Sequence, residues 1–265
     1  MKKLLLAALL AVSSQTVLAH TLWVMPSHFV LSGDDTWISV DVSAANMTFV
    51  PDKGVSPDNL SIIFPDGSRH KFAHSYQGKR KSQADHQLVA EGTYLIENGG
   101  APRYFTMFEV NGERKRIMAD KKAAASQLPA GATKVMTSRG QSKSLAVVTV
   151  KAPNRTAITP SGEGFELNFV THPADYVAED AIEWQLLLDG KPAAGVKVEL
   201  SREAELYRNN AGRITAETDA EGKLQFTPEY AGRYLLEASY QANTKTDLAD
   251  SVRASLTLTF EVGLP

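Results

Sequence analysis

The residue of this sequence whose chemistry depends most on its place in the chain is His20. It follows residues 1–19, MKKLLLAALLAVSSQTVLA, which contain two lysines, an apolar run from Leu4 to Val12, and Val17-Leu18-Ala19. This order is typical of a secretory signal peptide, and the apolar run is too short to cross a hydrocarbon core of about 30 Å. We therefore expect cleavage after Ala19, which makes His20 the first residue of the exported chain.

An N-terminal histidine can bind a metal ion through two nitrogens of one residue, the free α-amine and the imidazole. Both kinds of nitrogen release their proton close to neutral pH, so a metal ion displaces it at small cost. Nitrogen ligands favour Cu(II), Ni(II), Co(II) or Zn(II) over magnesium or calcium. His20 is thus a candidate ligand, and the competing interpretation is chance, because the chain has 6 histidines in 265 residues.

Two further histidines flank a polar segment. The runs Lys71-Phe72-Ala73-His74 and His86-Gln87-Leu88-Val89 enclose residues 75–85. If these flanks pair as a hairpin, His74 and His86 face each other at the base of the loop, and directly opposed residues have Cβ atoms about 5 Å apart. The pair is then a candidate for joint metal ligation, and the simpler alternative is two solvated polar side chains.

Other kinds of chemistry find little support. The chain has no cysteine, which excludes disulfides, thiolate metal sites and a cysteine nucleophile. It also lacks Gly-x-Ser-x-Gly, His-Glu-x-x-His and a glycine-rich phosphate loop, so we do not expect an enzyme. The net charge of −2 gives no electrostatic footprint for nucleic acid. No apolar run after the leader is long enough to insert into a membrane.

Short strands must position these candidate residues. Apolar and polar residues alternate in Ile38–Val42, Ile182–Leu188 and Leu256–Val262, the pattern of strands with one buried face. Turn signals such as Asn111-Gly112 separate such runs. The pattern predicts an all-β fold of immunoglobulin-like or prealbumin-like antiparallel β-sandwiches. The one helix candidate, the charged segment 113–128, should form at most a short surface helix.

A stretch with proline and glycine divides the chain. Residues 153–163 show no periodic apolar pattern and are typical of a linker. We therefore predict two sandwich domains in tandem, residues 20–152 and 164–265, each long enough to bury its own core. In the second domain the alternation places Trp184 on the inward face.

Four sequence features together resemble a known family. They are His20-Thr21-Leu22-Trp23-Val24-Met25-Pro26, the segment Gly162–Leu167 followed by His172-Pro173, the turns at Asp189–Pro192 and Thr218–Gly222, and the final run Ala254–Val262. Over its whole exported length the chain is similar to a domain-of-unknown-function family described as the periplasmic component of cobalt and nickel uptake systems. The resemblance implies a periplasmic protein that binds nickel or cobalt, and the nitrogen ligands of His20 add copper to this class of metals. It also implies a membrane transporter or an outer-membrane receptor component as the partner.

One departure from the family pattern bears on the metal. Family members often carry a Gly-His or similar pair after the second strand, where this chain has Ala44-Ala45-Asn46-Met47. We therefore expect metal affinity or preference to differ from that of such members.

Three functions fit these observations. The favoured one is a periplasmic protein that binds a divalent transition metal at His20 and passes it to a membrane uptake system. A second is a structural or interaction module of the cell envelope without any ligand, which the metal content of the processed protein would distinguish. A third is a copper enzyme with an N-terminal histidine brace, which certain polysaccharide-cleaving enzymes resemble at this one residue and which a redox assay would reveal.

Overall fold

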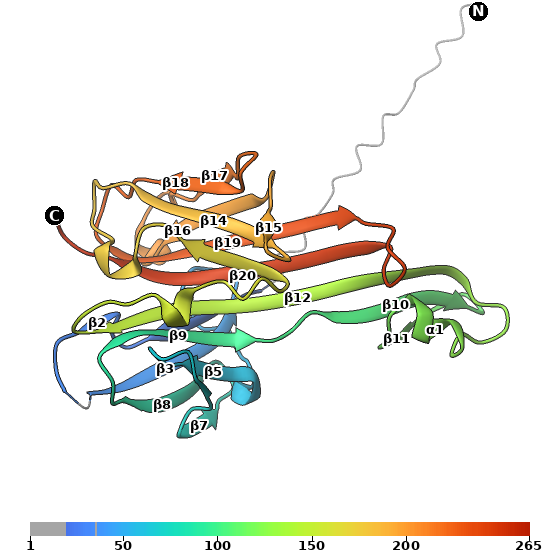
Figure 1. Ribbon diagram of the computed structural model, residues 1–265, viewed down its shortest axis with the longest axis horizontal. Helices are drawn as coiled ribbons and strands as arrows, with labels where there is room; N and C mark the ends of the chain where they lie inside the picture. Colours follow the sequence, from blue (N-terminus) through green and yellow to red (C-terminus); the bar gives the residue numbers. More distant parts are fainter. Residues whose placement is uncertain (1–19, 35) are drawn as a thin grey trace, which may run out of the picture.

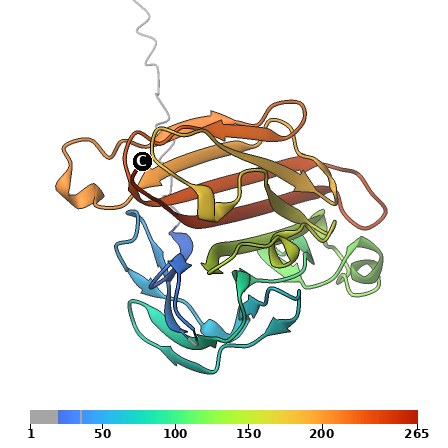
Figure 2. The same cartoon turned by 60° about the vertical axis from the view of Figure 1, so that its left-hand side comes forward.

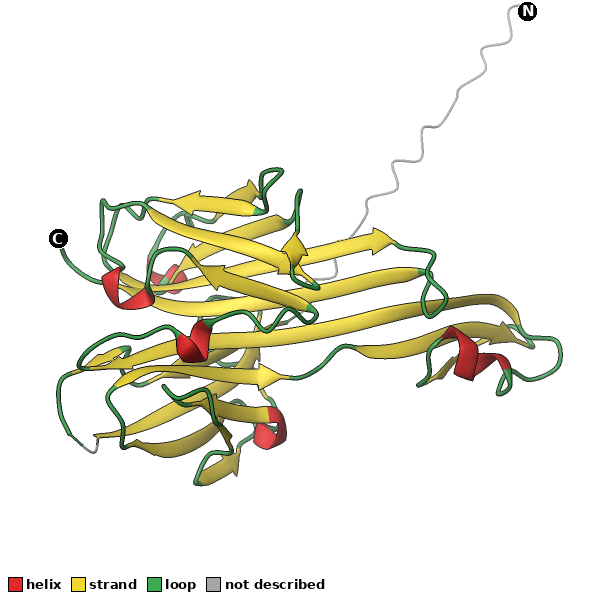
Figure 3. Ribbon diagram, viewed as in Figure 1, coloured by secondary structure: helices red, strands yellow, loops and turns green. Residues whose placement is uncertain are grey.

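The computed structural model describes residues 20–34 and 36–265; the expected signal peptide, residues 1–19, lies outside this part. Nearly all of the regular structure is β (Figures 1 and 3), which confirms the prediction of an all-β, immunoglobulin-like sandwich fold. The strands are β1 (Thr21–Pro26), β2 (Val30–Leu31), β3 (Thr36–Ala45), β4 (Lys53–Gly54), β5 (Leu60–Ile63), β6 (Arg69–His70), β7 (His74–Gln77), β8 (Ser82–Leu88), β9 (Gly92–Gly99), β10 (Arg103–Val110), β11 (Glu113–Ile117), β12 (Thr133–Val150), β13 (Phe165–Phe169), β14 (Ile182–Leu188), β15 (Lys191–Pro192), β16 (Lys197–Arg202), β17 (Ile214–Glu217), β18 (Lys223–Phe226), β19 (Gly232–Asn243) and β20 (Ser251–Val262). The helices are α1 (Lys121–Ala125) and the 3₁₀ turns η1 (Pro57–Asn59), η2 (Thr156–Ile158), η3 (Pro173–Asp175) and η4 (Glu205–Tyr207).

The first sandwich packs a small sheet against one end of a large one. The small sheet has the order β1-β3-β8-β7, with β4 paired to β3. Ile38, Val40 and Val42 of β3 point into the core, as their alternation with polar residues predicts, and meet Ile62 of β5 and Ile96 of β9 there.

The second sandwich packs a four-stranded sheet, β13-β14-β15 with β18 on β14, against the other end of the large sheet. Trp184 of β14 is fully buried in its core, which confirms the predicted strand phase. The indole Nε1 of Trp184 donates a hydrogen bond of 2.7 Å to the Tyr176 hydroxyl.

One eleven-stranded sheet joins the two sandwiches (Figure 2). Its path runs β17-β16-β19-β20-β12-β9-β5-β6, and the junction is a parallel pairing of β12 with β20 from Ser138 opposite Ser251 to Ala146 opposite Thr259. Successive side chains of β12 therefore enter different cores. Leu145 lies in the core of the second sandwich, and Ala146 lies in the core of the first.

The segment predicted to be a linker is packed rather than loose. Ile158 of η2 is buried in the second core. The Asn154 side chain accepts a hydrogen bond from the Thr93 backbone and donates one to the Pro65 carbonyl. The segment lacks a periodic apolar pattern and is still partly buried, because a 3₁₀ turn buries its side chains without the alternation of a strand.

An arm made of β10, β11, α1 and the first half of β12 extends beyond the sandwiches (Figure 1). The predicted helix candidate 113–128 is only partly helical. β11 forms instead because Asn111 and Gly112 adopt positive φ angles of 52° and 79°, which turns the chain back onto β10. None of the helices in the described ranges is both long and apolar enough to cross a membrane.

Candidate functional site

His20 lies directly before β1, at the edge of the first sandwich that faces the shared sheet. Thr21 is opposite Ala45 in the pairing of β1 with β3, which brings His20 close to the loop that follows β3. In that loop, Asp52 Oδ2 lies 2.7 Å from His20 Nε2. The side chains of His20 and Asp52 are 41% and 50% exposed, so the pair is open to solvent.

The contact with Asp52 determines which ring nitrogen of His20 donates a hydrogen bond and which one can bind a metal. A carboxylate accepts a hydrogen bond, so Nε2 carries the proton and Nδ1 of the neutral ring keeps a free lone pair. Nδ1 is the ring nitrogen nearer to the backbone nitrogen of the same residue, so the two can close a chelate ring around one ion. A carboxylate on the outer nitrogen also raises the basicity of a metal-bound histidine and orients its ring. This arrangement fits a nitrogen-ligated transition-metal ion.

A hollow of about 830 Å³ lies beside His20, on the face of the shared sheet that the first sandwich leaves open. Its charged lining residues, besides His20, are Lys143, Lys197, Glu199, Arg213, Glu217 and Glu237. Arg213 donates to Glu199 at 2.7 Å and, deeper in the protein, to Glu205 at 3.0 Å. Glu199 is thereby neutralised, which leaves Glu217 and Glu237 as the acids of this hollow without an ion pair among the described residues.

Glu237 is the acid that connects the hollow to β1. Its Oε2 accepts a hydrogen bond of 2.7 Å from the Thr21 hydroxyl, one residue after His20. Burial raises the pKa of Glu237, so this carboxyl takes up a proton more easily than an exposed glutamate. A cation arriving in the hollow would stabilise its charged form.

Within the described residues, no group of three or more histidine, aspartate or glutamate side chains is arranged to hold a metal ion. A metal at His20 would therefore take Nδ1 and the α-amine that the expected cleavage after Ala19 would create, with Asp52 behind the ring. Its other coordination positions would be filled by water or by a second molecule.

His74 and His86 are not brought together. In the β7–β8 hairpin, His74 lies opposite Asp85, and the connection spans residues 78–81 instead of the expected 75–85. A shift of one residue turns a side chain to the other face of a sheet. The predicted opposition of His74 and His86 is therefore wrong, and the argument for joint ligation falls with it.

The two histidines have different surroundings. His74 is exposed, and its ring stacks on Trp37 with centroids 6.2 Å apart. His86 points inward between Phe64 and Phe72, each with ring centroids 5.5 Å away. Burial lowers the pKa of His86, and its Nδ1 has no hydrogen-bond partner among the residues described. Apolar packing at Phe64 and Phe72 thus sets the register that separates the histidines.

The chain shows likenesses at low sequence identity to several solved structures. The D0–D1 domain of intimin is 12% identical, with 89% of this chain and 96% of that chain covered and a TM-score of 0.21. The D00–D0 domain of intimin is 12% identical over 91% and 99% of the two chains, with a TM-score of 0.20. A D1–D4 ectodomain fragment of ICAM-5 is 10% identical over 92% and 51%, also with a TM-score of 0.20. No curated protein matches significantly in sequence. These likenesses carry no argument about ligand or partner.

A family model gives a much firmer relationship. It matches residues 17–242, a range that runs from the expected cleavage site through the first sandwich and into β19. The range contains His20, Asp52 and Glu237, the residues that form the site described above. The match covers most of the 265 residues, and the chain therefore belongs to the family defined by the domain of unknown function DUF4198.

Proposed function

We propose that the protein is a periplasmic carrier of a divalent transition metal of the nickel, cobalt or copper class. The metal is bound by the α-amine and Nδ1 of His20, and is passed to a membrane transporter or an outer-membrane receptor component. The observation that carries the proposal is the 2.7 Å contact between His20 Nε2 and Asp52, because it leaves Nδ1 free beside the backbone nitrogen. The periplasmic location rests on the signal peptide expected at residues 1–19.

The exposure of the site favours a carrier over a permanent metal store. A chelate from one exposed residue leaves coordination positions through which the ligands of a partner can enter before the first ligands leave. A closed site with four protein ligands would hold the ion more firmly and release it more slowly. The half-exposed His20 ring therefore fits transfer better than storage.

The two alternatives make different demands. A histidine-brace copper enzyme needs a second imidazole on the ion, and His20 is the one histidine among the described residues that line the hollow. An envelope module without a ligand needs no site at all, and it gains support if His20 binds nothing. We favour binding over catalysis on these grounds.

Calorimetric titration of Ni(II) and Cu(II) at pH 7.5 into three forms of the chain tests the proposal. One form begins at His20, one carries an extra methionine before His20, and one begins at an alanine through His20→Ala. We expect the first form to bind at least tenfold more tightly than the others, which is about 1.4 kcal/mol, because an amide nitrogen replaces the amine in the second and the imidazole is missing in the third. Equal affinities in all three forms would reject the chelate and favour the envelope module.

Two variants sharpen the result. Asp52→Asn should weaken binding by about tenfold, the lower end of the loss typical for a carboxylate behind a ligating histidine. His74→Ala, on an exposed histidine away from the site, should leave affinity unchanged. Binding should also weaken as the pH falls, because protons compete with the metal for the nitrogen ligands.

A further inference from the structure

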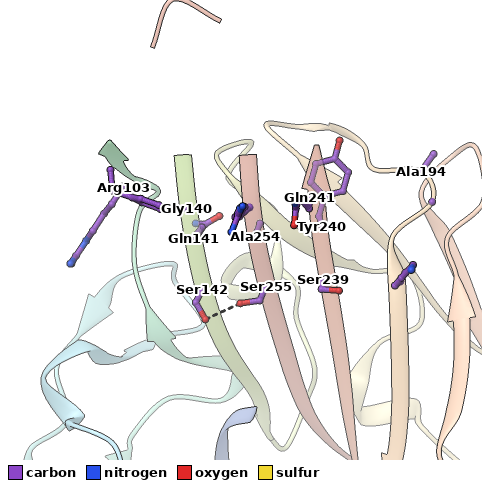
Figure 4. Close-up of a pocket in the computed structure, with 14 residues that line it drawn as sticks. Arg103, Gly140, Gln141, Ser142, Ala194, Ser239, Tyr240, Gln241, Ala254 and Ser255 are labelled. Atoms are coloured by element: carbon purple, nitrogen blue, oxygen red, sulfur yellow. Dashed lines mark hydrogen bonds between the residues drawn. The ribbon is translucent and has the colours of Figure 1, made fainter. Parts of the chain in front are cut away.

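A second hollow, of about 1030 Å³, shares Ser142, Lys197, Ser239 and Ser255 with the hollow at His20. Figure 4 shows the residues that line this second hollow. Strands β10, β12, β20 and β19 form its floor, and the start of β16 adds Lys197. Its lining contains three cationic side chains, Arg103, Lys197 and Arg253, and no carboxylate. This is unusual for a chain with a net charge of −2.

The strand register arranges the lining in two rows. The first row crosses four strands in the order Arg103, Gly140, Arg253 and Gln241. The second row crosses four strands in the order Ser142, Ser255, Ser239 and Lys197. Neighbouring strands lie about 4.8 Å apart, so the Cα atoms of Arg103 and Arg253 are about 10 Å apart with only a glycine between them.

Gly140 makes room between the two arginines. A Cβ atom at this position would lie 2.9 Å from Cε1 of Phe105, so the phenylalanine ring covers the glycine backbone. Phe105 also belongs to the lining of the hollow. Arg103 and Arg253 therefore lie on either side of Gly140 in the strand order, with the apolar ring of Phe105 over this glycine.

The three cations differ from other cations near this face in having no partner. Arg213 is paired with Glu199 and Glu205, and Arg139 with Asp189. Arg103, Lys197 and Arg253 form no side-chain hydrogen bond or ion pair with any other described residue. Guanidinium groups present several N–H donors in a fork that matches carboxylate and phosphate oxygens.

Hydroxyl groups complete the polar lining. The Ser255 hydroxyl donates a hydrogen bond of 3.0 Å to Ser142 Oγ, drawn as a dashed line in Figure 4. The proton of the Ser142 hydroxyl is then available for an acceptor in the hollow. Ser239 presents a third hydroxyl in the same row.

We propose that this hollow binds a small organic anion that carries at least two carboxylate or phosphate groups. Arg103 and Arg253 each hold one of these groups, Lys197 adds a third positive charge, and the serine row donates hydrogen bonds. The proposal uses neither His20 nor a metal ion. It does place the anion next to His20, because Ser142, Lys197, Ser239 and Ser255 line both hollows.

Calorimetric titration of the metal-free chain at low ionic strength tests this site. The probes are citrate for carboxylates, pyrophosphate for phosphates, and acetate as a single-charge control. We expect citrate or pyrophosphate to bind at least tenfold more tightly than acetate and to weaken as salt is added. Whichever probe binds more tightly identifies the oxyanion chemistry. If neither exceeds acetate, the proposal is wrong.

Charge-neutral variants locate the binding. Arg103→Gln and Arg253→Gln should each weaken binding at least fivefold, and the double variant should reduce it to the level of acetate. The matched control is Lys79→Gln, which removes one exposed positive charge outside both hollows. A double variant that binds as tightly as Lys79→Gln, with an unchanged circular dichroism spectrum, would overturn the assignment. His20→Ala should leave anion affinity unchanged, so this test and the metal titration can fail independently.

Discussion

The two sandwiches each bury a tryptophan, but only the second gives its indole a hydrogen-bond partner. Trp184 is fully buried, and its Nε1 donates to the Tyr176 hydroxyl at 2.7 Å. Trp23 of β1 is 2% exposed, and its Nε1 has no partner among the described residues. His86 Nδ1 and Asn98 Nδ2, both in the first sandwich, are also buried without a described partner.

The hydrogen bond of Trp184, which Trp23 lacks, indicates that polar contacts as well as apolar packing define the second core. A buried donor without a partner costs about 1–3 kcal/mol relative to a paired one. Burial raises the pKa of the Tyr176 hydroxyl, so this hydroxyl stays neutral. Its oxygen accepts the hydrogen bond from the indole N–H of Trp184. We therefore expect the second sandwich to be the more sensitive to substitution, and the first to open more readily.

Removing the Trp184 side chain should have the largest effect. Trp184→Ala should lower the free energy of unfolding by about 3–5 kcal/mol, the usual cost of truncating a buried aromatic residue. Urea unfolding followed by far-ultraviolet circular dichroism measures it. A loss below about 1 kcal/mol would mean that the second core does not depend on this side chain.

The second largest loss of stability should come from removing Glu205, which connects the two sandwiches. Glu205 accepts hydrogen bonds from the Thr48 backbone at 3.0 Å and from Arg213 at 3.0 Å. Glu205→Ala leaves both donors without this partner and should cost about 1–3 kcal/mol in the same measurement. An unchanged stability would show that the shared sheet alone holds the sandwiches together.

Low pH should remove the stabilisation that Glu205 provides through the hydrogen bonds that it accepts from Thr48 and Arg213. Burial opposes ionisation of Glu205, but hydrogen bonds from Arg213 and Thr48 outweigh it, so its pKa lies below the ordinary value. The stabilisation is therefore complete above the unfolded pKa of about 4.3 and is lost as the pH falls through the lower folded pKa. The difference in stability between wild type and Glu205→Gln should shrink over that range, whereas a constant difference would contradict it.

Paired phenylalanine variants compare the two tryptophans directly. Trp184→Phe leaves the Tyr176 hydroxyl unpaired, whereas Trp23→Phe removes an N–H that had no described partner. We expect Trp184→Phe to cost about 1 kcal/mol more than Trp23→Phe. Equal losses would show that the indole hydrogen bond does not distinguish the cores.

The smallest effect should come from His86, and it should depend on pH. Burial, with a contribution from the charge of His70, lowers the pKa of His86 in the folded chain. The unfolded chain then takes up the proton first, so this residue lowers stability as the pH falls below about 6.5. His86→Leu should remove that part of the pH dependence, by less than about 1 kcal/mol. His74→Ala, on an exposed histidine of the same hairpin, is the matched control variant.

The sequence predicts the strands better than it predicts their partners. Alternation locates the inward face of β3 and β14, because it needs only neighbouring residues. Register depends on the facing strand, which is why His74 pairs with Asp85 instead of His86. The junction of β12 with β20 pairs residues more than a hundred positions apart. No local sequence pattern predicts this pairing.

The candidate site shows the same limit. His20 stands out in the sequence because it directly follows the expected signal peptide. Asp52, 32 positions away in a loop, has no periodic signal that would connect it to His20. Arg103 and Arg253 lie two strands apart in one row only because β10, β12 and β20 are neighbours in the shared sheet.

The sheet that contains the junction of β12 with β20 is completed only after β20 has been synthesised, long after β1. β20 (Ser251–Val262) follows β1 (Thr21–Pro26) by more than two hundred residues, so β1 is synthesised well before β20. The Leu22 carbonyl accepts a hydrogen bond from the Thr257 hydroxyl, and the Thr21 hydroxyl donates one to Glu237. Both partners lie more than two hundred residues later in the chain. Until these later residues have been synthesised, Thr21 and Leu22 lack these two hydrogen bonds. The cleavage that would create a free amine at His20 therefore has a natural window, which closes as the last strand enters the sheet.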